Sequence, residues 1–178
     1  MWAMVAAVVL AAGASSRFGS PKQRLLLRPV LERVRNARSV DEIVVVVGAH
    51  EVETDARVVR CAAWERGPGA SLRCGLAELA PNAEAAVVVL ADGPSLSPEA
   101  IDRVVEAWRK RAGDVVAASY RGNRGHPVVL GRPVWAQIPD EGARALEPTL
   151  VPCDDLGPPG DVDTPADLAG RARDAGAE

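Results

Sequence analysis

An apolar run and the small-residue loop that follows it decide the fold: Val5-Ala-Ala-Val-Val-Leu-Ala-Ala12 and then Gly13-Ala-Ser-Ser-Arg-Phe-Gly-Ser-Pro-Lys-Gln23. The apolar run is typical of a strand that is buried on both faces. Glycines and serines let the backbone N–H groups of the loop approach an anionic ligand. Arg17 adds a planar guanidinium and Lys22 a mobile ammonium, which suit a polyphosphate. The segment therefore predicts a strand followed by a loop that holds a nucleoside triphosphate.

Three other interpretations of this loop fit less well. A Walker A loop needs Gly-Lys in sequence, whereas Ser20-Pro21 separates Gly19 from Lys22. The dinucleotide motif G-x-G-x-x-G fails because the residue two after Gly13 is Ser15. A secretory signal carries its positive charge before the apolar run, and here the charge follows it. A strand and turn without a ligand remains as the structural alternative.

Composition indicates one globular domain over residues 1–178. Hydrophobic residues make up 48% and charged residues 25%, and the net charge is −3. This charge provides no field that attracts nucleic acid or an anionic membrane, and 3% aromatic residues are too few for a base-stacking surface. No apolar run approaches the roughly 20 residues that span a bilayer. Neither a nucleic-acid partner nor a membrane partner is expected.

The three cysteines are odd in number and scattered, at positions 61, 74 and 153, and they include no C-x-x-C pair. This usage favours a reducing compartment and argues against a structural zinc site. The sequence therefore predicts a cytoplasmic protein.

Short β-branched runs alternate with helical patterns, which favours an α/β fold. The expected strands are Val5–Leu10, Ile43–Val47, Val58–Arg60, Val87–Leu90, Val115–Ala118 and an antiparallel Val128–Leu130. The expected helices are Pro29–Arg38, a segment from the N-cap Ser97 to about Arg111, and Ala166–Arg173, with a winding loop at Pro148–Gly160. These elements predict a three-layer, mostly parallel, Rossmann-like sheet with helices on both faces, whose ligands lie beyond the carboxyl ends of the strands.

Two carboxylates are candidate metal ligands. Asp92 directly follows the run Val87–Ala91, beside the presumed phosphate loop, and Mg²⁺ is usually held by one or two carboxylates together with phosphate oxygens. Alternatively, Asp92 only caps the Gly93-Pro94 turn. Asp163 is a second candidate ligand, or simply the N-cap of the last helix.

Two further loops are candidate binding segments. The loop around Gly69 and Ser71 precedes a helical pattern to about Leu79, and its free N–H groups would read a base edge; the alternative is a tight turn with Ser71 as cap. Gly125-His126-Pro127 ends a flexible basic segment that could receive an anionic co-substrate, although an exposed loop histidine is often without function.

Several motifs together resemble those of the nucleotidyltransferases that activate molybdenum cofactor, related to molybdopterin-guanine dinucleotide synthase. They are Leu10-Ala-Ala-Gly-x-Ser-Ser-Arg-x-Gly-x-Pro-Lys-Gln23, Val44–Gly48, Trp64…Gly69-Ala-Ser-Leu-Arg-x-Gly75, Leu90-Ala-Asp-x-Pro94, Arg124-Gly-His-Pro-Val128, Gly142-Ala-Arg144 and Asp161-Val-Asp-Thr-Pro-x-Asp-Leu168. The Leu-Ala-Ala-Gly and Ser-Ser-Arg forms are more similar to the cytidylyltransferase branch than to the guanylyltransferase branch. The resemblance implies the nucleotide-diphospho-sugar transferase fold.

The resemblance also implies a role for each matching residue. Contacts to the nucleotide and its phosphates are implied for Leu10, Ala11, Ala12, Gly13 and Arg17, and Lys22 would bind the α-phosphate. Asp92 and Asp163 would bind Mg²⁺. Gly69 and Ser71 would contact the base, and Gly125 and His126 would contact the acceptor. The chain departs from the family at Arg24–Arg28, which is short and lacks glycine, and around Cys61, where an Asn is usual.

The implied activity is Mg²⁺-dependent transfer of CMP from CTP to the phosphate of molybdopterin, with release of pyrophosphate. A recipient molybdoenzyme or its chaperone is an implied partner. The alternatives are GTP-dependent guanylyl transfer to the same cofactor, nucleotidyl transfer to a sugar or polyol phosphate, and a nucleotide-binding protein without catalysis.

Overall fold

The computed structural model of the chain describes residues 2–13 and 22–160, and the side chains of residues 22–25 are outside its description. Its elements in chain order are β1 (Met4–Ala11), α1 (Lys22–Asn36), β2 (Glu42–Val47), β3 (Arg57–Arg60), the 3₁₀ turn η2 (Trp64–Arg66), α2 (Pro68–Ala77), β4 (Ala83–Leu90), α3 (Pro98–Arg109), β5 (Val115–Tyr120), β6 (Asn123–Gly131), the 3₁₀ turns η3 (Arg132–Gln137) and η4 (Ala143–Ala145), and β7 (Thr149–Pro152).

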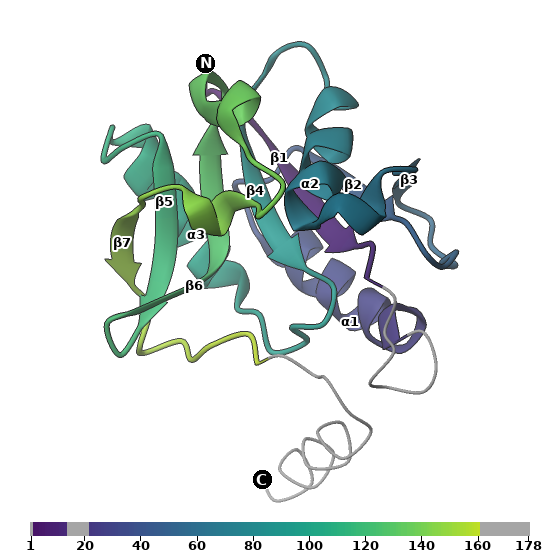
Figure 1. The fold of residues 1–178 in the computed structure, drawn as a ribbon. Helices are drawn as coiled ribbons and strands as arrows, with labels where there is room; N and C mark the ends of the chain where they lie inside the picture. The colour runs from purple at the N-terminus through teal and green to yellow at the C-terminus, as the bar shows by residue number, and fades with distance from the viewer. Residues whose placement is uncertain (1, 14–21, 161–178) are drawn as a thin grey trace, which may run out of the picture.

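Within these ranges seven strands form one sheet in the order β3-β2-β1-β4-β6-β5-β7. Figure 1 shows β3 and β7 at opposite edges of the molecule. Strands β3, β2, β1 and β4 are parallel, whereas β6 runs antiparallel to both β4 and β5. The expected antiparallel strand at Val128–Leu130 is therefore confirmed, and it extends back to Asn123.

Apolar layers cover both faces of the sheet. On one face, α1 and α3 pack against the strands through Val30, Val34, Ile101 and Val104. On the other face, α2 contributes Leu72 and Leu76. Because both faces are covered, the central strands are apolar at nearly every position, as expected for a parallel sheet. The three-layer, mostly parallel fold expected from the sequence is confirmed.

Helix α1 begins seven residues before the expected start at Pro29. Leu26 and Leu27 are buried and extend the apolar stripe of Val30, Leu31 and Val34 toward the N-terminus. This added burial outweighs the loss of one backbone hydrogen bond at Pro29, which therefore lies inside the helix. The segment without glycine at 24–28 is thus the first half of a helix.

The boundaries of α3 follow its sequence signals. Ser97 has extended backbone angles and Pro98 is the first helical residue, as expected. The Ser97 hydroxyl donates to Glu99 Oε2 at 2.7 Å, and no hydrogen bond from the Ser97 side chain caps the helix.

The C-terminal part contains an edge strand where the sequence predicts only a loop. The segment expected as a winding loop, Pro148–Gly160, contains the edge strand β7, which pairs in parallel with β5. This pairing depends on a neighbour about 33 residues earlier in the chain, and local composition does not report it. The expected last helix, Ala166–Arg173, lies outside the described residues.

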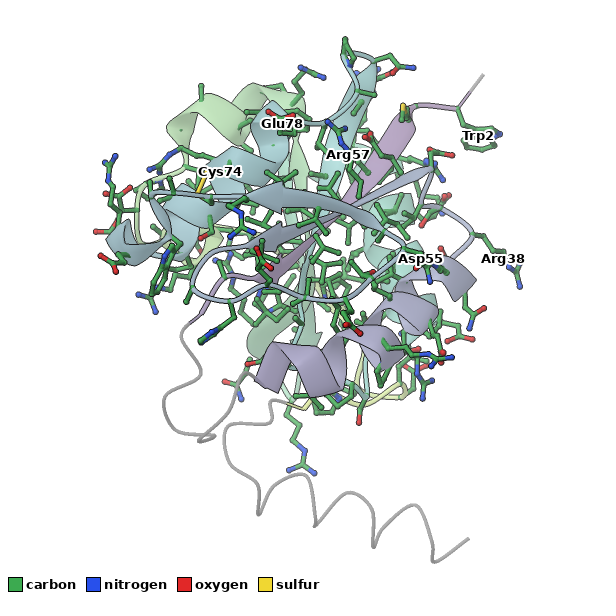
Figure 2. All side chains as sticks on the ribbon, turned by 90° about the vertical axis from the view of Figure 1, so that its right-hand side faces the viewer. Trp2, Arg38, Asp55, Arg57, Cys74 and Glu78 are labelled. Atoms are coloured by element: carbon green, nitrogen blue, oxygen red, sulfur yellow. A yellow bond between two sulfur atoms is a disulfide. The ribbon has the colours of Figure 1, made fainter. Side chains whose placement is uncertain are left out.

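A disulfide contradicts the prediction of a reducing compartment from the number and spacing of the cysteines. Cys61, just after β3, forms a disulfide with Cys74 in α2, and Figure 2 shows this bond beside the labelled Cys74. Cys153 is buried and reduced. A separation of 13 residues carries no pairing signal, because the contact is created by the packing of α2 on the sheet. In the described ranges no helix is long and apolar enough to cross a membrane.

Replacing Pro29 with alanine is expected to stabilise the protein. Pro29 is exposed and its missing N–H leaves a carbonyl of α1 without its helical partner, so Pro29→Ala should raise the free energy of unfolding by about 1–3 kcal/mol. Urea unfolding followed by circular dichroism measures this change.

Pro98→Ala provides a matched control. Pro98 is at the first position of α3, where no helical hydrogen bond is lost, so its replacement should be neutral or should destabilise by up to about 1 kcal/mol. Equal effects of the two substitutions would contradict the role assigned to Pro29.

Candidate active site

The turns after β1 and β4 open onto one cavity at the carboxyl edge of the sheet. Leu10 pairs with Leu90 in the register of the two strands, and the Ala91 N–H donates to the Leu10 carbonyl at 3.1 Å. The cavity has a volume of about 340 Å³ and is lined by Leu10, Ala12, Gly13, Trp64, Glu65, Gly67, Pro68, Ser71, Leu90, Ala91 and Asp92. The Gly13 turn and Asp92, 79 positions apart in the chain, thus face the same space.

The predicted nucleotide-binding residues of this turn separate into three groups. Leu10, Ala12 and Gly13 line the cavity. Ala11 is buried in the core on the α1 side and holds the end of β1 in place. Arg17 lies outside the described residues, and Lys22 is the first residue of α1, with its side chain also outside the description.

Gly69 and Ser71 lie in the first turns of α2, which corrects the expected loop. The helix begins at Pro68 and its N-cap is Gly67, so Ser71 is not a cap. Ser71 is 2% exposed and lines the cavity. The Gly69 N–H donates to the Asp140 carbonyl at 2.9 Å, so it is not free to read a base edge. Of the two predicted base contacts, the structure brings only Ser71 to the cavity.

Glycine is needed at positions 67 and 69 because the loop at Pro139 and Asp140 packs directly against the start of α2. A Cβ atom on Gly69 would lie 1.7 Å from the Pro139 carbonyl oxygen, and one on Gly67 would lie 2.4 Å from the Asp140 carbonyl oxygen. Gly67 also has φ +135°, which side chains rarely adopt. The glycines thus serve close packing of two backbone segments.

Asp140 fastens this crossing loop to α2. Its carboxylate accepts hydrogen bonds from Arg73 of α2 and from Arg66, the latter at 3.2 Å, and Arg73 also donates to the Ile138 carbonyl at 2.7 Å. The hydrogen bond from Arg73 holds the pKa of the Asp140 carboxyl below its usual range. The sequence offers no local signal for these contacts, because the partners are more than 60 residues apart.

A second cavity adjoins the first. It has a volume of about 290 Å³ and shares Leu10, Pro68 and Leu90 with the first cavity. Its other lining residues are Leu72, Val88, Arg124, Gly125, His126, Val128, Glu141, Gly142, Ala143 and Arg144. The two predicted acceptor residues, Gly125 and His126, therefore face a space next to the candidate nucleotide cavity. They belong to strand β6, which corrects the expected flexible segment.

His126 is neutral at neutral pH. Burial of the imidazole and, to a smaller extent, the nearby Arg124 guanidinium lower the pKa of His126 to about 4, against the opposing effect of the Asp92 carboxylate. The Tyr120 hydroxyl donates to the His126 carbonyl at 2.7 Å and fixes the backbone at this point. A neutral imidazole offers one donor and one acceptor to a ligand and no charge.

Asp92 fits a divalent ion that is bound together with a phosphorylated substrate. Its half-buried carboxylate lines the first cavity, and Mg²⁺ takes one or two carboxylates along with phosphate oxygens and water. No three His, Cys, Asp or Glu side chains of residues 2–13 and 22–160 gather around one point, so an all-protein cage is absent from these ranges. The predicted second ligand, Asp163, lies outside the described residues.

Stability of the metal-free protein should fall in acid through His126. The folded pKa of about 4 is below the ordinary value of 6.5, so the folded state binds fewer protons than the unfolded state between these values. Above pH 6.5 the titration of His126 has no effect on stability. As the pH falls from 6.5 to 4, it should lower the free energy of unfolding by up to about 3 kcal/mol.

Denaturant unfolding between pH 4 and 7 measures this effect, with His126→Gln as the matched variant. Removal of the titrating group should flatten the pH dependence in this window. Identical slopes for the variant and the wild type would contradict the depressed pKa.

Fold and cavity define a class: a three-layer, mostly parallel α/β protein with a cavity at the carboxyl edge of its sheet. The chain belongs to the family described as the MobA-like NTP transferase domain, whose model matches residues 7–147. It is therefore a member of a nucleotidyltransferase family.

Solved structures share the fold over nearly the whole chain. The homologue of Mycobacterium tuberculosis Rv0371c from Mycobacterium sp. strain JC1 is 27% identical, with a TM-score of 0.80 and coverage of 98% of each chain. Rv0371c of M. tuberculosis, in a complex with manganese, is 26% identical with a TM-score of 0.69, and the match covers 94% of this chain and 97% of that one.

Curated relatives match over part of their length. Bifunctional protein GlmU of Cutibacterium acnes is 34% identical over 123 residues, which is 61% of this chain and 29% of the relative. The 3-deoxy-manno-octulosonate cytidylyltransferase of Anaeromyxobacter sp. strain K is 38% identical over 115 residues, 58% of this chain and 46% of the relative. The chain therefore spans less than half the length of these relatives.

Proposed function

We propose that this nucleotidyltransferase moves CMP from CTP to the phosphate of molybdopterin and releases pyrophosphate. The observation that carries the proposal is the adjacency of two cavities at one sheet edge. One is lined by the Gly13 turn and Asp92, and the other by Gly125 and His126. This arrangement provides a nucleotide site and an acceptor site that share Leu10 and Leu90 as a common border.

In the proposed reaction, an oxygen of the acceptor phosphate attacks the α-phosphorus of CTP and forms the new P–O bond. The bond between the α-phosphorus and its bridging oxygen breaks, and the electron pair leaves with pyrophosphate. A phosphate oxygen is already nucleophilic at neutral pH, so the reaction needs no general base, in agreement with a neutral His126. The protein's task is positioning and charge neutralisation.

The residues divide this task by location. We assign the triphosphate to the Gly13 turn with Arg17, and the α-phosphate to Lys22 at the start of α1. Asp92, with Asp163 as a second ligand, would hold Mg²⁺, which supplies charge stabilisation at the phosphates when bound. The manganese complex of the structurally similar Rv0371c supports the use of a divalent ion.

A preference for CTP over GTP is part of the proposal. The Leu10-Ala-Ala-Gly13 segment favours it, and a cytidylyltransferase is among the relatives. Ser71 supplies a hydroxyl in the first cavity, and Trp64 supplies an aromatic wall. We place the reaction in the cytoplasm, where the triphosphate is available, with a recipient molybdoenzyme or its chaperone as the next partner.

A second candidate acceptor is a sugar or polyol phosphate. The similarity to the 3-deoxy-manno-octulosonate cytidylyltransferase favours it, because that name denotes a sugar-acid substrate. The floor of the second cavity is apolar, formed by Leu72, Val88 and Val128, and offers few partners for a ring of hydroxyl groups. This floor favours the flat pterin over the sugar.

Pyrophosphate release tests the proposal. CTP and GTP are each supplied with molybdopterin, a sugar 1-phosphate or a polyol phosphate, in the presence and absence of Mg²⁺. Release with CTP and molybdopterin is expected, and it should require Mg²⁺. Release only with a sugar or polyol phosphate would replace the acceptor, and CTP binding without any turnover would support the non-catalytic alternative.

Lys22→Ala and Asp92→Ala should each reduce the rate of pyrophosphate release by about 10²–10³, because each removes a preorganised charge at the reacting phosphates. Asp55→Ala is the matched control: its carboxylate is exposed and pairs with Arg35 at 2.7 Å away from either cavity. Turnover near the wild-type rate in the Lys22 or Asp92 variant, with the fold intact, would remove that residue from the site.

A further inference from the structure

The segment 138–146 forms one wall of the second cavity, and hydrogen bonds hold it at both ends. At its first end, Asp140 is bound by Arg66 and Arg73, and its carbonyl receives the Gly69 N–H. At its other end, the Arg124 guanidinium donates to the carbonyls of Leu146 at 2.6 Å and Ala143 at 2.7 Å. The backbone between these two ends is therefore held in place, and its residues 141–144 line the cavity, with Glu141 and Arg144 exposed.

This segment brings Arg144 to the cavity. Three lining residues can carry positive charge: Arg124, His126 and Arg144. Arg124 directs its donors to backbone carbonyls, including that of Arg144 itself at 3.4 Å. His126 is neutral at neutral pH. Within residues 2–13 and 22–160 the Arg144 guanidinium forms no hydrogen bond or ion pair, although Glu141 lines the same cavity.

Apart from Glu141, the remaining side chains that line the cavity are apolar, and this contrast indicates the chemistry of its ligand. Leu72, Val88, Leu90 and Val128 offer no hydrogen-bond partner, so a ligand gains there by burying an apolar or flat portion. A guanidinium at the margin binds phosphate with two parallel N–H donors.

We infer that Arg144 binds the anionic group of the acceptor and thereby sets where the acceptor phosphate lies relative to the nucleotide cavity. This inference rests on the proposed function and adds a binding residue to it. Arg124 and Asp140 act as positioning residues, because their hydrogen bonds hold the two ends of the segment that carries Arg144.

The experiment measures pyrophosphate release from CTP and molybdopterin and determines KM for each substrate separately. Arg144→Gln should raise KM for molybdopterin by about 10- to 100-fold, as expected for loss of a charged hydrogen bond. KM for CTP should change less than twofold, which also shows that the variant is folded. Arg144→Lys keeps the charge without the planar fork and should give an intermediate KM for molybdopterin.

Arg111→Gln is the matched control. Arg111 is an exposed arginine that precedes β5, at the opposite edge of the sheet from both cavities, and its replacement removes the same charge. It should leave both KM values unchanged. An equal rise of the molybdopterin KM in Arg111→Gln would show that the effect of Arg144→Gln comes from the change in net charge, and it would overturn the inference.

Calorimetric measurement of CTP binding to the wild type distinguishes failure of this inference from failure of the proposed function. Turnover with an unchanged molybdopterin KM in Arg144→Gln would overturn the role of Arg144 and leave the proposed function in place. Absence of CTP binding, or CTP binding without pyrophosphate release in the wild type, would overturn the proposed function and this inference together.

Discussion

The parallel pairing of β1 with β4 is the constraint on which the rest of the site depends. Their register places Leu10 beside Leu90, and the Ala91 N–H continues the pairing one residue beyond β4. Because both strands end at the same level, the turn at Gly13 and the carboxylate of Asp92 face one cavity. The buried valines and alanines on both faces of the sheet hold this register, since a slip would displace every one of them.

The other wall of the site depends on close backbone contact between α2 and the segment 138–142. Gly67 and Gly69 permit the approach, and Asp140 with Arg66 and Arg73 stabilises it. The disulfide between Cys61 and Cys74 ties the same helix to the end of β3. Helix α2 is thus held from two sides, and the same helix presents Ser71 to the first cavity and Leu72 to the adjoining one.

Local patterns predicted the strands well, because a strand covered on both faces is apolar along its whole length. They were less successful where distant segments decide the outcome. Pro29 suggested a helix start, yet burial of Leu26 and Leu27 extends the helix past it. Gly69 suggested a ligand loop, yet its N–H and its missing Cβ serve the contact with Pro139 and Asp140.

The sequence by itself determined the fold class and the two turns that meet at the carboxyl edge, because strand patterns and turn residues are local properties. It also carried the motifs of the family. Only the tertiary structure decided that Ser71 lines the first cavity while Gly69 does not, and that Cys61 pairs with Cys74. It also decided that Arg124 binds the carbonyls of a neighbouring segment and that this segment brings Arg144 to the second cavity. Each of these depends on partners far apart in the chain, and such contacts exist only after the layers pack together.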